Sequence, residues 1–145
     1  GWNKDGWPAS SMRSYLSTDI YNALPVDLQS AIIDTKVVSG HGKDDTDNFI
    51  STDKLYLLEP KEVYGNNVGT AYSATRQLDY YSSQGVTTSN YSGAIKQLNG
   101  TNNFWWLRAA YSGNYDTFYS VGSDGRWSGT IATATRGVSP AFRIA

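Results

Sequence analysis

The sequence contains no cysteine and only one histidine, and these two absences remove several classes of chemistry. Without thiols there are no disulfides, no thiolate nucleophile and no cysteine-bound metal. With His41 alone, neither a histidine dyad nor a multi-histidine metal site can form. His41 stands between Gly40 and Gly42 in a polar stretch, which indicates a solvated side chain. We therefore expect a protein that is not an enzyme and uses no cofactor.

The chain also lacks an excess of charge of either sign. Its 12 basic and 13 acidic residues give a net charge of -1, and charged residues make up only 17% of the sequence. This balance gives no electrostatic reason to expect a nucleic-acid partner or an anionic membrane surface. No apolar run approaches the roughly 18 residues of a membrane span, so we expect no direct membrane insertion.

Oxygen ligands in a convincing metal-binding order are missing as well. The densest acidic cluster lies at residues 44–48, but Phe49 stands where the calcium-loop pattern requires a third ligand. We interpret the cluster as a solvated loop, with a weak cation site as the alternative. The only two glutamates, Glu59 and Glu62, fit the first turn of a helix, where acidic side chains oppose the helix dipole. We therefore expect no metal site.

The hydrophobic patterning that is present predicts an α+β fold in a single domain of residues 1–145, because helical patterns come first and strand patterns follow. Apolar residues at helical spacing predict short helices at residues 10–16, 19–24 and 25–32, one turn at 59–62, and weaker helical pieces at 74–81 and 94–98. Short apolar or aromatic runs predict strands at residues 35–38, 55–58, 104–107, 118–121, 126–128 and 138–144. The turn residues Ser123, Asp124 and Gly125 predict a hairpin between two of these strands.

The C-terminal third has a different composition from the rest of the chain. Residues 109–145 contain no Lys, Glu, Gln or Met, whereas residues 1–108 carry 6 Lys, 2 Glu, 4 Gln and 1 Met. The segment is instead rich in Tyr, Ser, Gly, Asn, Asp, Thr and Arg, which is the composition of an antibody-like binding surface. An ordinary solvated hairpin is the alternative interpretation of the same residues.

Several motifs resemble a bacterial domain family that ends in W-W-L-R … F-x-x-V-x-x-x-G-x-W … G-V-x-P-A-F. In this chain the matching residues are Trp105, Trp106, Leu107, Arg108, Phe118, Val121, Gly125, Trp127 and the segment 137–144. Residues 11–16 and 53–58 also look like that family. The ending is similar to the variable regions of diversity-generating retroelements, whose target proteins adopt a C-type lectin-like fold that formylglycine-generating enzymes share. The resemblance thus implies a C-type lectin-like fold with short N-terminal helices and a small antiparallel sheet.

In such systems a reverse transcriptase rewrites adenines, typically within AAC codons, and the resulting NNC codons never encode Lys, Glu, Gln, Met or Trp. The resemblance therefore implies that residues 109–136 form a variable ligand-binding region and that Trp127 belongs to the scaffold. The implied ligand-binding residues are Tyr111, Gly113, Asn114, Tyr115, Asp116, Thr117, Tyr119, Ser120, Gly122, Ser123, Asp124, Arg126, Ser128, Gly129, Thr130, Ile131, Thr133 and Arg136.

The chain departs from the resembling families at the residues that carry their chemistry. The catalytic cysteines of formylglycine-generating enzymes are absent, and Glu59-Pro60-Lys61 replaces the calcium triplet of sugar-binding lectins. The expected function is therefore receptor-like binding of a protein or another surface ligand, at a cell surface or on a phage particle. The alternatives are an invariant structural module of a bacterial surface protein and a degenerate relative of the formylglycine-generating enzymes.

Four structural expectations follow from this interpretation. Residues 1–3 should approach residues 138–144, and Trp106 and Trp127 should be largely buried in one core. The guanidinium of Arg108 should bind backbone carbonyls or a carboxylate, whereas Arg126 should be exposed. The implied ligand-binding residues should share one exposed face of about 800 Å², the size of one side of a standard interface. The side chains that should point away from this face are Phe118, Val121, Trp127, Ala132 and Phe142.

Overall fold

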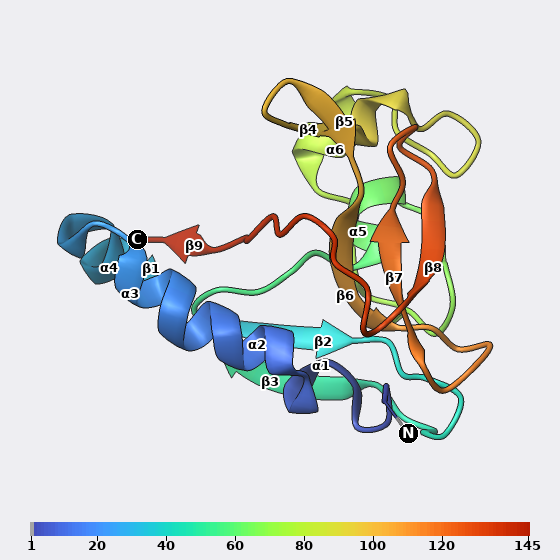
Figure 1. The fold of residues 1–145 in the computed structure, drawn as a ribbon, viewed down its shortest axis with the longest axis horizontal. Coiled ribbons are helices and arrows are strands. Elements are labelled where there is room, and N and C mark those ends of the chain that lie inside the picture. The colour runs from blue at the N-terminus through green and yellow to red at the C-terminus, as the bar shows by residue number, and fades with distance from the viewer. Residues whose placement is uncertain (1) are drawn as a thin grey trace.

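The computed structural model describes residues 2–145, and it confirms an α+β fold built from short helices and small antiparallel sheets (Figure 1). Gly1, part of the N-terminal segment expected near the C-terminal strand, lies outside the described residues. Within residues 2–145 no helix is long and apolar enough to cross a bilayer. The N-terminal helices pack along one small sheet, and the C-terminal strands form another (Figure 1).

The N-terminal third forms a helical arm, as the apolar periodicity predicts. Its elements are α1 (Gly6–Ala9), α2 (Ser11–Tyr15), the π-helical η1 (Leu16–Ile20), α3 (Tyr21–Ala23) and α4 (Val26–Ala31). Ser10 caps α2, because its hydroxyl accepts a hydrogen bond from the Arg13 amide at 3.1 Å. The backbone stays helical from α2 through α3, and the chain turns extended at Leu24, just before Pro25.

Four small antiparallel sheets follow in the chain. The two-stranded sheets pair β1 (Ile32–Ile33) with β9 (Arg143–Ile144), β2 (Thr35–Ser39) with β3 (Phe49–Asp53), and β4 (Lys96–Leu98) with β5 (Thr101–Asn103). The three-stranded sheet has the order β6 (Trp105–Ala110), β7 (Thr117–Val121) and β8 (Trp127–Ile131). The remaining short helices are α5 (Pro60–Tyr64), α6 (Asp79–Ser83) and the 3₁₀ turn η2 (Ser92–Ala94).

Two strand predictions are too long. In the predicted strand 55–58 only Tyr56 forms a bridge, which pairs it with Ala141. The predicted strand 138–144 is regular only at Arg143–Ile144, because Pro140 lacks the amide that a ladder needs. The two segments pair with each other at this bridge, where the Tyr56 amide donates to the Ala141 carbonyl at 3.1 Å and the Ala141 amide donates to the Tyr56 carbonyl at 2.7 Å.

The helical piece predicted at residues 94–98 is wrong, because this segment enters the β4–β5 hairpin. Asn99 and Gly100 both have positive φ, at 53° and 80°, and Leu98 pairs directly with Thr101. This is the two-residue hairpin turn that an Asn-Gly pair favours. The Asn-Gly signal outweighs the weak helical spacing of residues 94–98.

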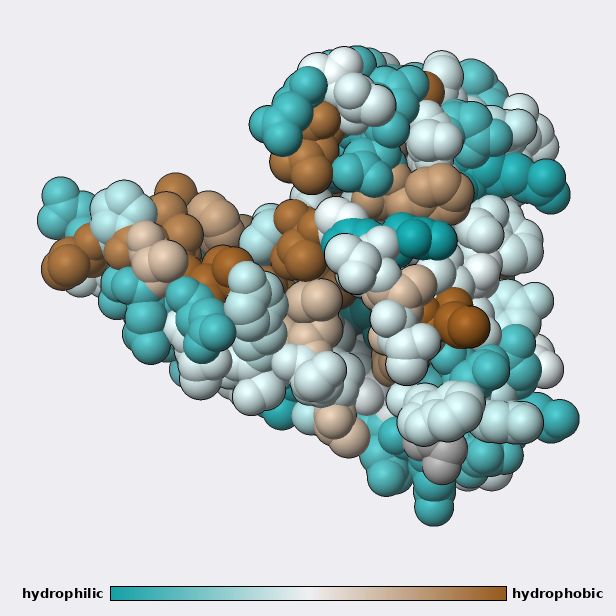
Figure 2. All heavy atoms as spheres, viewed as in Figure 1, coloured by the Kyte–Doolittle hydropathy of each residue, from teal (hydrophilic) through white to brown (hydrophobic). Residues whose placement is uncertain are grey.

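The two chain ends do not meet, contrary to expectation. The Asn3 amide donates to the Tyr115 carbonyl at 2.9 Å, so the N-terminal residues lie against the β6–β7 connection. The C-terminal strand instead pairs with β1, with Ile144 opposite Ile32 (Figure 1). The exposed apolar residues Val26 and Ile144 belong to this end of the arm, where Figure 2 shows apolar side chains gathering.

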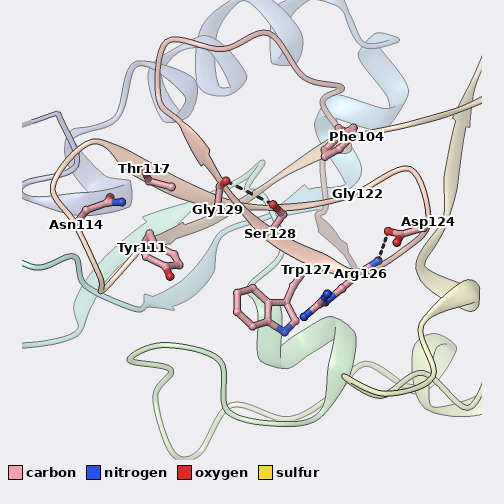
Figure 3. A pocket seen from close by; sticks show the side chains of 10 residues that line it. All are labelled: Phe104, Tyr111, Asn114, Thr117, Gly122, Asp124, Arg126, Trp127, Ser128 and Gly129. Atoms are coloured by element: carbon pink, nitrogen blue, oxygen red, sulfur yellow. Dashed lines mark hydrogen bonds between the residues drawn. The ribbon is translucent and has the colours of Figure 1, made fainter.

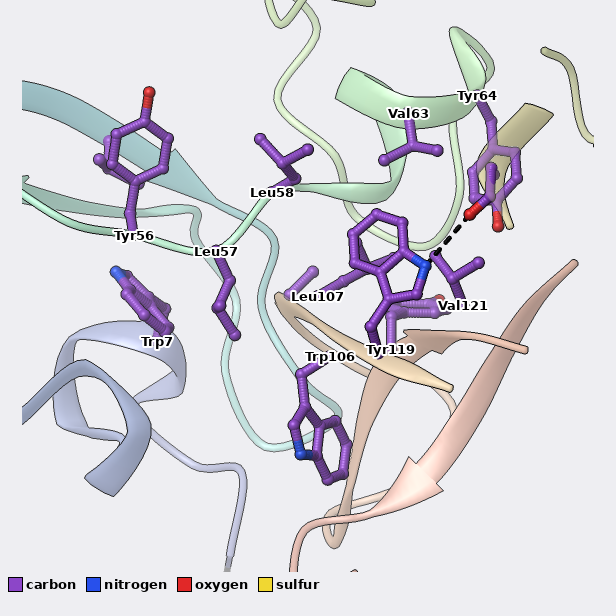
Figure 4. Packing of buried hydrophobic residues seen from close by; sticks show 14 of the residues in the cluster. Trp7, Tyr56, Leu57, Leu58, Val63, Tyr64, Trp106, Leu107, Tyr119 and Val121 are labelled. Atoms are coloured by element: carbon purple, nitrogen blue, oxygen red, sulfur yellow. Dashed lines mark hydrogen bonds between the residues drawn. The ribbon is translucent and has the colours of Figure 1, made fainter. Parts of the chain in front are cut away.

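The core lies where α5, β6 and β7 meet. Val63, Leu107 and Val121 are among its fully buried side chains, and Figure 4 shows them packed together beneath α5. Trp106 is buried as expected, whereas Trp127 is only half-buried at the border of the core. The difference follows from position, since β6 is covered on both faces and β8 is the last strand of its sheet.

Arg108 ties β6 to three other parts of the fold, namely β2, the segment 55–58 and α5. Its guanidinium donates to the Leu57 carbonyl at 2.9 Å and to the Val38 carbonyl at 2.8 Å. It also forms an ion pair with Glu62 and lies 3.6 Å from the buried carboxylate of Glu59. The expectation that this scaffold arginine binds carbonyls and a carboxylate is confirmed, and Arg126 is exposed.

Candidate ligand-binding site

A groove runs along the outer edge of β8, and we call it the β8 groove (Figure 3). It has a volume of about 500 Å³ and is open to solvent. Its lining residues are Phe104, Tyr111, Asn114, Thr117, Gly122, Asp124, Arg126, Trp127, Ser128 and Gly129. All except Phe104 and Trp127 belong to the implied ligand-binding set, although the set was selected without any structure.

The β7–β8 hairpin positions one end of this groove, and its turn is where the sequence predicts it. The Gly122 amide donates to the Arg126 carbonyl at 2.7 Å, and the Asp124 carboxylate accepts from the Arg126 amide at 3.0 Å. Gly125 has φ 91°, and a Cβ there would overlap the carbonyl oxygen of Tyr91. Only glycine combines a positive φ with the absence of a Cβ, so this residue is required for the turn that places Arg126 beside the groove.

The other end of the groove is formed by the connection between β6 and β7. The Asn3 side-chain amide donates to three carbonyls of this connection, those of Tyr111 at 3.2 Å, Asn114 at 3.0 Å and Thr117 at 2.9 Å. Asn3 is fully buried, so water does not compete for these bonds. Sequence reasoning missed Asn3, because no local pattern connects it with residues more than a hundred positions away.

Aromatic side chains form the floor on one side of β8. The Tyr119 ring lies 5.1 Å from the ring of Tyr111 and 5.8 Å from that of Trp127. A second hollow of about 360 Å³ adjoins the groove there, since Tyr111 and Trp127 line both. Burial raises the pKa of the Tyr119 phenol above its ordinary value, so this hydroxyl stays neutral over the physiological range.

The structure corrects the expectation that all implied ligand-binding residues are exposed. Five of them are buried: Thr117, Tyr119, Ser120, Gly122 and Thr130. β7 is the middle strand of its sheet, and both of its faces are covered. Thr130 of β8 is buried with it, since its hydroxyl lies 2.7 Å from that of Ser120. The sequence interpretation assumed that alternate residues of the strand face solvent, but both faces of β7 are packed, so alternation leaves neither side free.

The remaining implied residues divide into two groups. Eight are exposed, namely Gly113, Tyr115, Ser123, Asp124, Arg126, Gly129, Ile131 and Thr133. Five are half-buried, namely Tyr111, Asn114, Asp116, Ser128 and Arg136. The groove does not include Gly113, Tyr115, Asp116, Tyr119, Ser120, Ser123, Thr130, Ile131, Thr133 and Arg136.

Of the side chains expected to point inward, Val121 is buried, Phe118, Trp127 and Ala132 are half-buried, and Phe142 is exposed, which contradicts the expectation for Phe142.

Two further groups take part that the sequence did not single out as ligand-binding. Phe104 lies at the groove wall, where the Arg136 guanidinium stacks 4.7 Å from its ring centre. Residues 67–69 border the second hollow, and Gly69 lies so close to Tyr119 that a Cβ would overlap the hydroxyl. The sequence predicts Phe104 only as the start of a strand, and the weak patterning between residues 65 and 103 concealed the contribution of residues 67–69.

The acidic loop binds distant segments of the chain, whereas His41 contacts its neighbour Gly42. The Asp45 carboxylate accepts from the Asp5 amide at 2.9 Å, and the Asn48 amide donates to the Thr70 carbonyl at 2.6 Å. His41 is half-buried, with its Nδ1 2.7 Å from the Gly42 carbonyl, so it is less solvated than the sequence indicated. Among the described residues no three His, Cys, Asp or Glu side chains cluster as metal ligands would.

One known protein family matches residues 2–145, and its description is "Domain of unknown function (DUF6273)". The match covers every residue that the structure describes. No curated protein and no solved structure matches the chain. The description states no activity, so the functional argument depends on the geometry of the groove.

Proposed function

The chain belongs to the DUF6273 family, whose function is unknown, and we propose that it is a ligand-binding domain that receives a protein partner in the β8 groove. The observation that carries this proposal is the lining of the groove. Residues implied to bind ligand, drawn from the β6–β7 connection and from the β7–β8 hairpin, line one hollow. These residues come from one stretch of the chain, residues 111–129, which the β6–β7 connection and the β7–β8 hairpin fold around a common hollow.

The chemistry of the groove suits a protein surface. Tyr111 and Trp127 supply large rigid contact areas, whose immobilisation costs little conformational entropy. Asn114 and Ser128 supply adaptable hydrogen bonds, and the exposed Arg126 supplies a positive charge. No histidine or cysteine lines the groove, and its one carboxylate, Asp124, binds the backbone of its own turn. The domain therefore acts by binding, without catalysis.

The proposal extends to a C-type lectin-like scaffold with a diversified surface. In support, the W-W-L-R residues Trp105 to Arg108 are all buried, as scaffold residues would be. Diversification would then be confined to exposed and half-buried positions, because substitutions at buried ones such as Tyr119 and Ser120 disturb the core. The proposed host is a cell surface or a phage particle.

Sequencing the genomic locus tests diversification. We expect a reverse transcriptase gene and a template repeat that differs from codons 109–136 only at adenines in the template. A locus that contains neither the gene nor the repeat would contradict diversification and favour the invariant structural module.

An array of purified proteins and glycans tests binding directly. The wild-type domain is compared with Arg126→Glu in the groove and with the control Lys36→Glu, which reverses an exposed positive charge on β2. We expect protein spots whose signal falls on the order of tenfold with Arg126→Glu and is unchanged with Lys36→Glu. Equal loss with both variants, or binding restricted to glycans, would contradict the proposal.

A further inference from the structure

The two edges of the β6–β7–β8 sheet differ in how far other segments of the chain cover them. The outer edge of β6 is covered: the Trp106 amide donates to the Gly137 carbonyl at 3.0 Å, and the Arg108 amide donates to the Leu58 carbonyl at 2.9 Å. The outer edge of β8 has no such neighbour, since β8 pairs only with β7 within the described chain. One edge is closed by tertiary structure, and the other is available to a partner.

The register of the hairpin identifies the backbone groups on that free edge. Hydrogen bonds run from the Gly122 amide to Arg126 and from the Ala132 amide to Asp116, at 2.7 and 2.8 Å. In an antiparallel ladder, hydrogen-bonded and non-hydrogen-bonded residue pairs alternate. The backbone amide and carbonyl groups of residues 128 and 130 therefore point toward β7. Those of residues 127, 129 and 131 point outward.

Four of these six outward amide and carbonyl groups have no partner among the described residues. The Ile131 carbonyl accepts from the Ala134 amide at 2.9 Å, and the Gly129 carbonyl has a long contact of 3.5 Å with the Ser128 hydroxyl. Neither the Trp127 amide and carbonyl nor the Gly129 and Ile131 amides bind any other loop or side chain of the described chain. Together they form a short row of donors and acceptors along one strand.

The β8 groove straddles this row. Tyr111 and Trp127 lie on one side of β8, and Phe104 and Ser128 lie on the other (Figure 3). At the middle stands Gly129, which is exposed and presents no side chain between a ligand and the strand. A Cβ at Gly129 would lie 2.9 Å from the Thr117 side chain and 3.2 Å from the Tyr111 ring, so the glycine makes room for Tyr111 on that side of β8.

We propose that the ligand of the β8 groove is an extended peptide segment of another protein, which adds to β8 as a further antiparallel strand; this deepens the proposed function and depends on it. Main-chain hydrogen bonds to Trp127, Gly129 and Ile131 supply affinity that is independent of the peptide sequence. Alternate side chains of the peptide fall on the two sides of β8 and contact Tyr111 and Trp127 or Ser128 and Phe104. A carboxylate at one end of the peptide pairs with Arg126.

A second copy of this chain fits the edge less well. Two β8 strands placed side by side share only five residues each, which buries far less than the roughly 800 Å² a side of a stable interface. A peptide segment has no such requirement, because it fills the groove on both sides of the strand.

The experiment selects short linear random peptides on the immobilised full domain, then measures amide hydrogen exchange with the enriched peptide. Strand addition predicts new protection of the amides of Trp127, Gly129 and Ile131, whereas Ser128 and Thr130 are already protected in the free domain. Ile131→Pro removes one outward amide without removing a β7–β8 hydrogen bond, and Ile131→Val is its matched control. We expect binding on the order of tenfold weaker with proline and unchanged with valine.

The other outcomes separate the two proposals. A peptide that loses binding with Arg126→Glu but not with Ile131→Pro, and that protects no outward amide, overturns strand addition and leaves groove binding intact. Peptides unaffected by both variants overturn both proposals, whereas a library that yields no binder overturns the peptide ligand alone, because the array of purified proteins tests groove binding separately. Outward amides that become protected in the free domain as its concentration rises, together with dimers in sedimentation, assign the edge to a second copy and overturn the peptide ligand.

Discussion

At the scale of single residues, the two arginines near the groove have opposite surroundings. Arg108 is buried and its guanidinium binds three structural elements through carbonyls and carboxylates. Arg126 is exposed, and only its backbone takes part in the hairpin turn. One side chain therefore holds the fold together, and the other is free to contact a ligand.

Replacement of these arginines by alanine measures that difference. Arg108→Ala leaves the carboxylates of Glu59 and Glu62 without their positive partner in a buried place, so we expect a loss of about 3–5 kcal/mol. Arg126→Ala should change the free energy of unfolding by no more than about 0.5 kcal/mol. Denaturant titration monitored by tryptophan fluorescence gives both values, and equal costs would contradict the assignment of scaffold and surface.

At the scale of elements, the β7–β8 hairpin depends on contacts from outside itself. The Tyr64 hydroxyl of α5 donates to the Gly125 carbonyl at 2.6 Å, so the turn is fixed to the helix. The β6–β7 connection is fixed in the same manner by Asn3. Both ends of the groove are thus fixed by residues outside its lining, Tyr64 and Asn3. Such preorganisation lowers the entropic cost of binding a ligand.

Two glycines with positive φ provide a matched test of the hairpin turn. Gly100→Ala places a Cβ in open space, so its cost should be the conformational penalty alone, about 1 kcal/mol. Gly125→Ala adds an overlap with the Tyr91 carbonyl, and we expect it to cost about 2 kcal/mol more than Gly100→Ala. Thermal unfolding of the two variants compares them, and similar melting temperatures would show that the turn relaxes without cost.

At the scale of the whole molecule, a helical arm and a groove occupy opposite ends of the fold. The core contains a buried charge cluster in which one arginine, Arg108, faces two glutamates, Glu59 and Glu62. Burial raises the pKa of Glu59 to about 7, the nearby Glu62 adds to this, and Arg108 opposes it. The global stability of the protein is therefore coupled to the protonation of one carboxyl group.

The sign of this coupling follows from proton binding. The folded state holds the Glu59 proton up to about pH 7, whereas the unfolded state releases it near 4.5. Between these values the folded state binds more protons, so stability falls as pH rises and levels off above about pH 7. Glu59→Gln should flatten this slope, and the exposed control Asp44→Asn should keep it. Denaturant titrations between pH 4.5 and 7 measure the free energy of unfolding of the wild type and both variants. If this free energy changes equally with pH in all three proteins, the coupling to Glu59 is refuted.

The sequence by itself determined the features that depend on local chemistry. The Ser10 cap, the break before Pro25 and the turn at Ser123 to Gly125 follow from residue types and short spacings, and the structure contains all three. The α+β order follows from the change in hydrophobic period along the chain. Eight of the ten residues that line the groove belong to the implied ligand-binding set, but ten residues of that set lie outside the groove.

Only the tertiary structure decided which of these residues are accessible. Tyr119 and Arg126 both belong to the implied ligand-binding set, yet one is buried and the other is exposed. The reason is that both faces of β7 are packed, whereas Arg126 lies in the exposed turn before β8, and this packing is set by contacts between distant segments. For the same reason no local pattern revealed Asn3 as the support of the groove. Residue type limits what a side chain can do, but its neighbours in space decide whether a ligand can reach it.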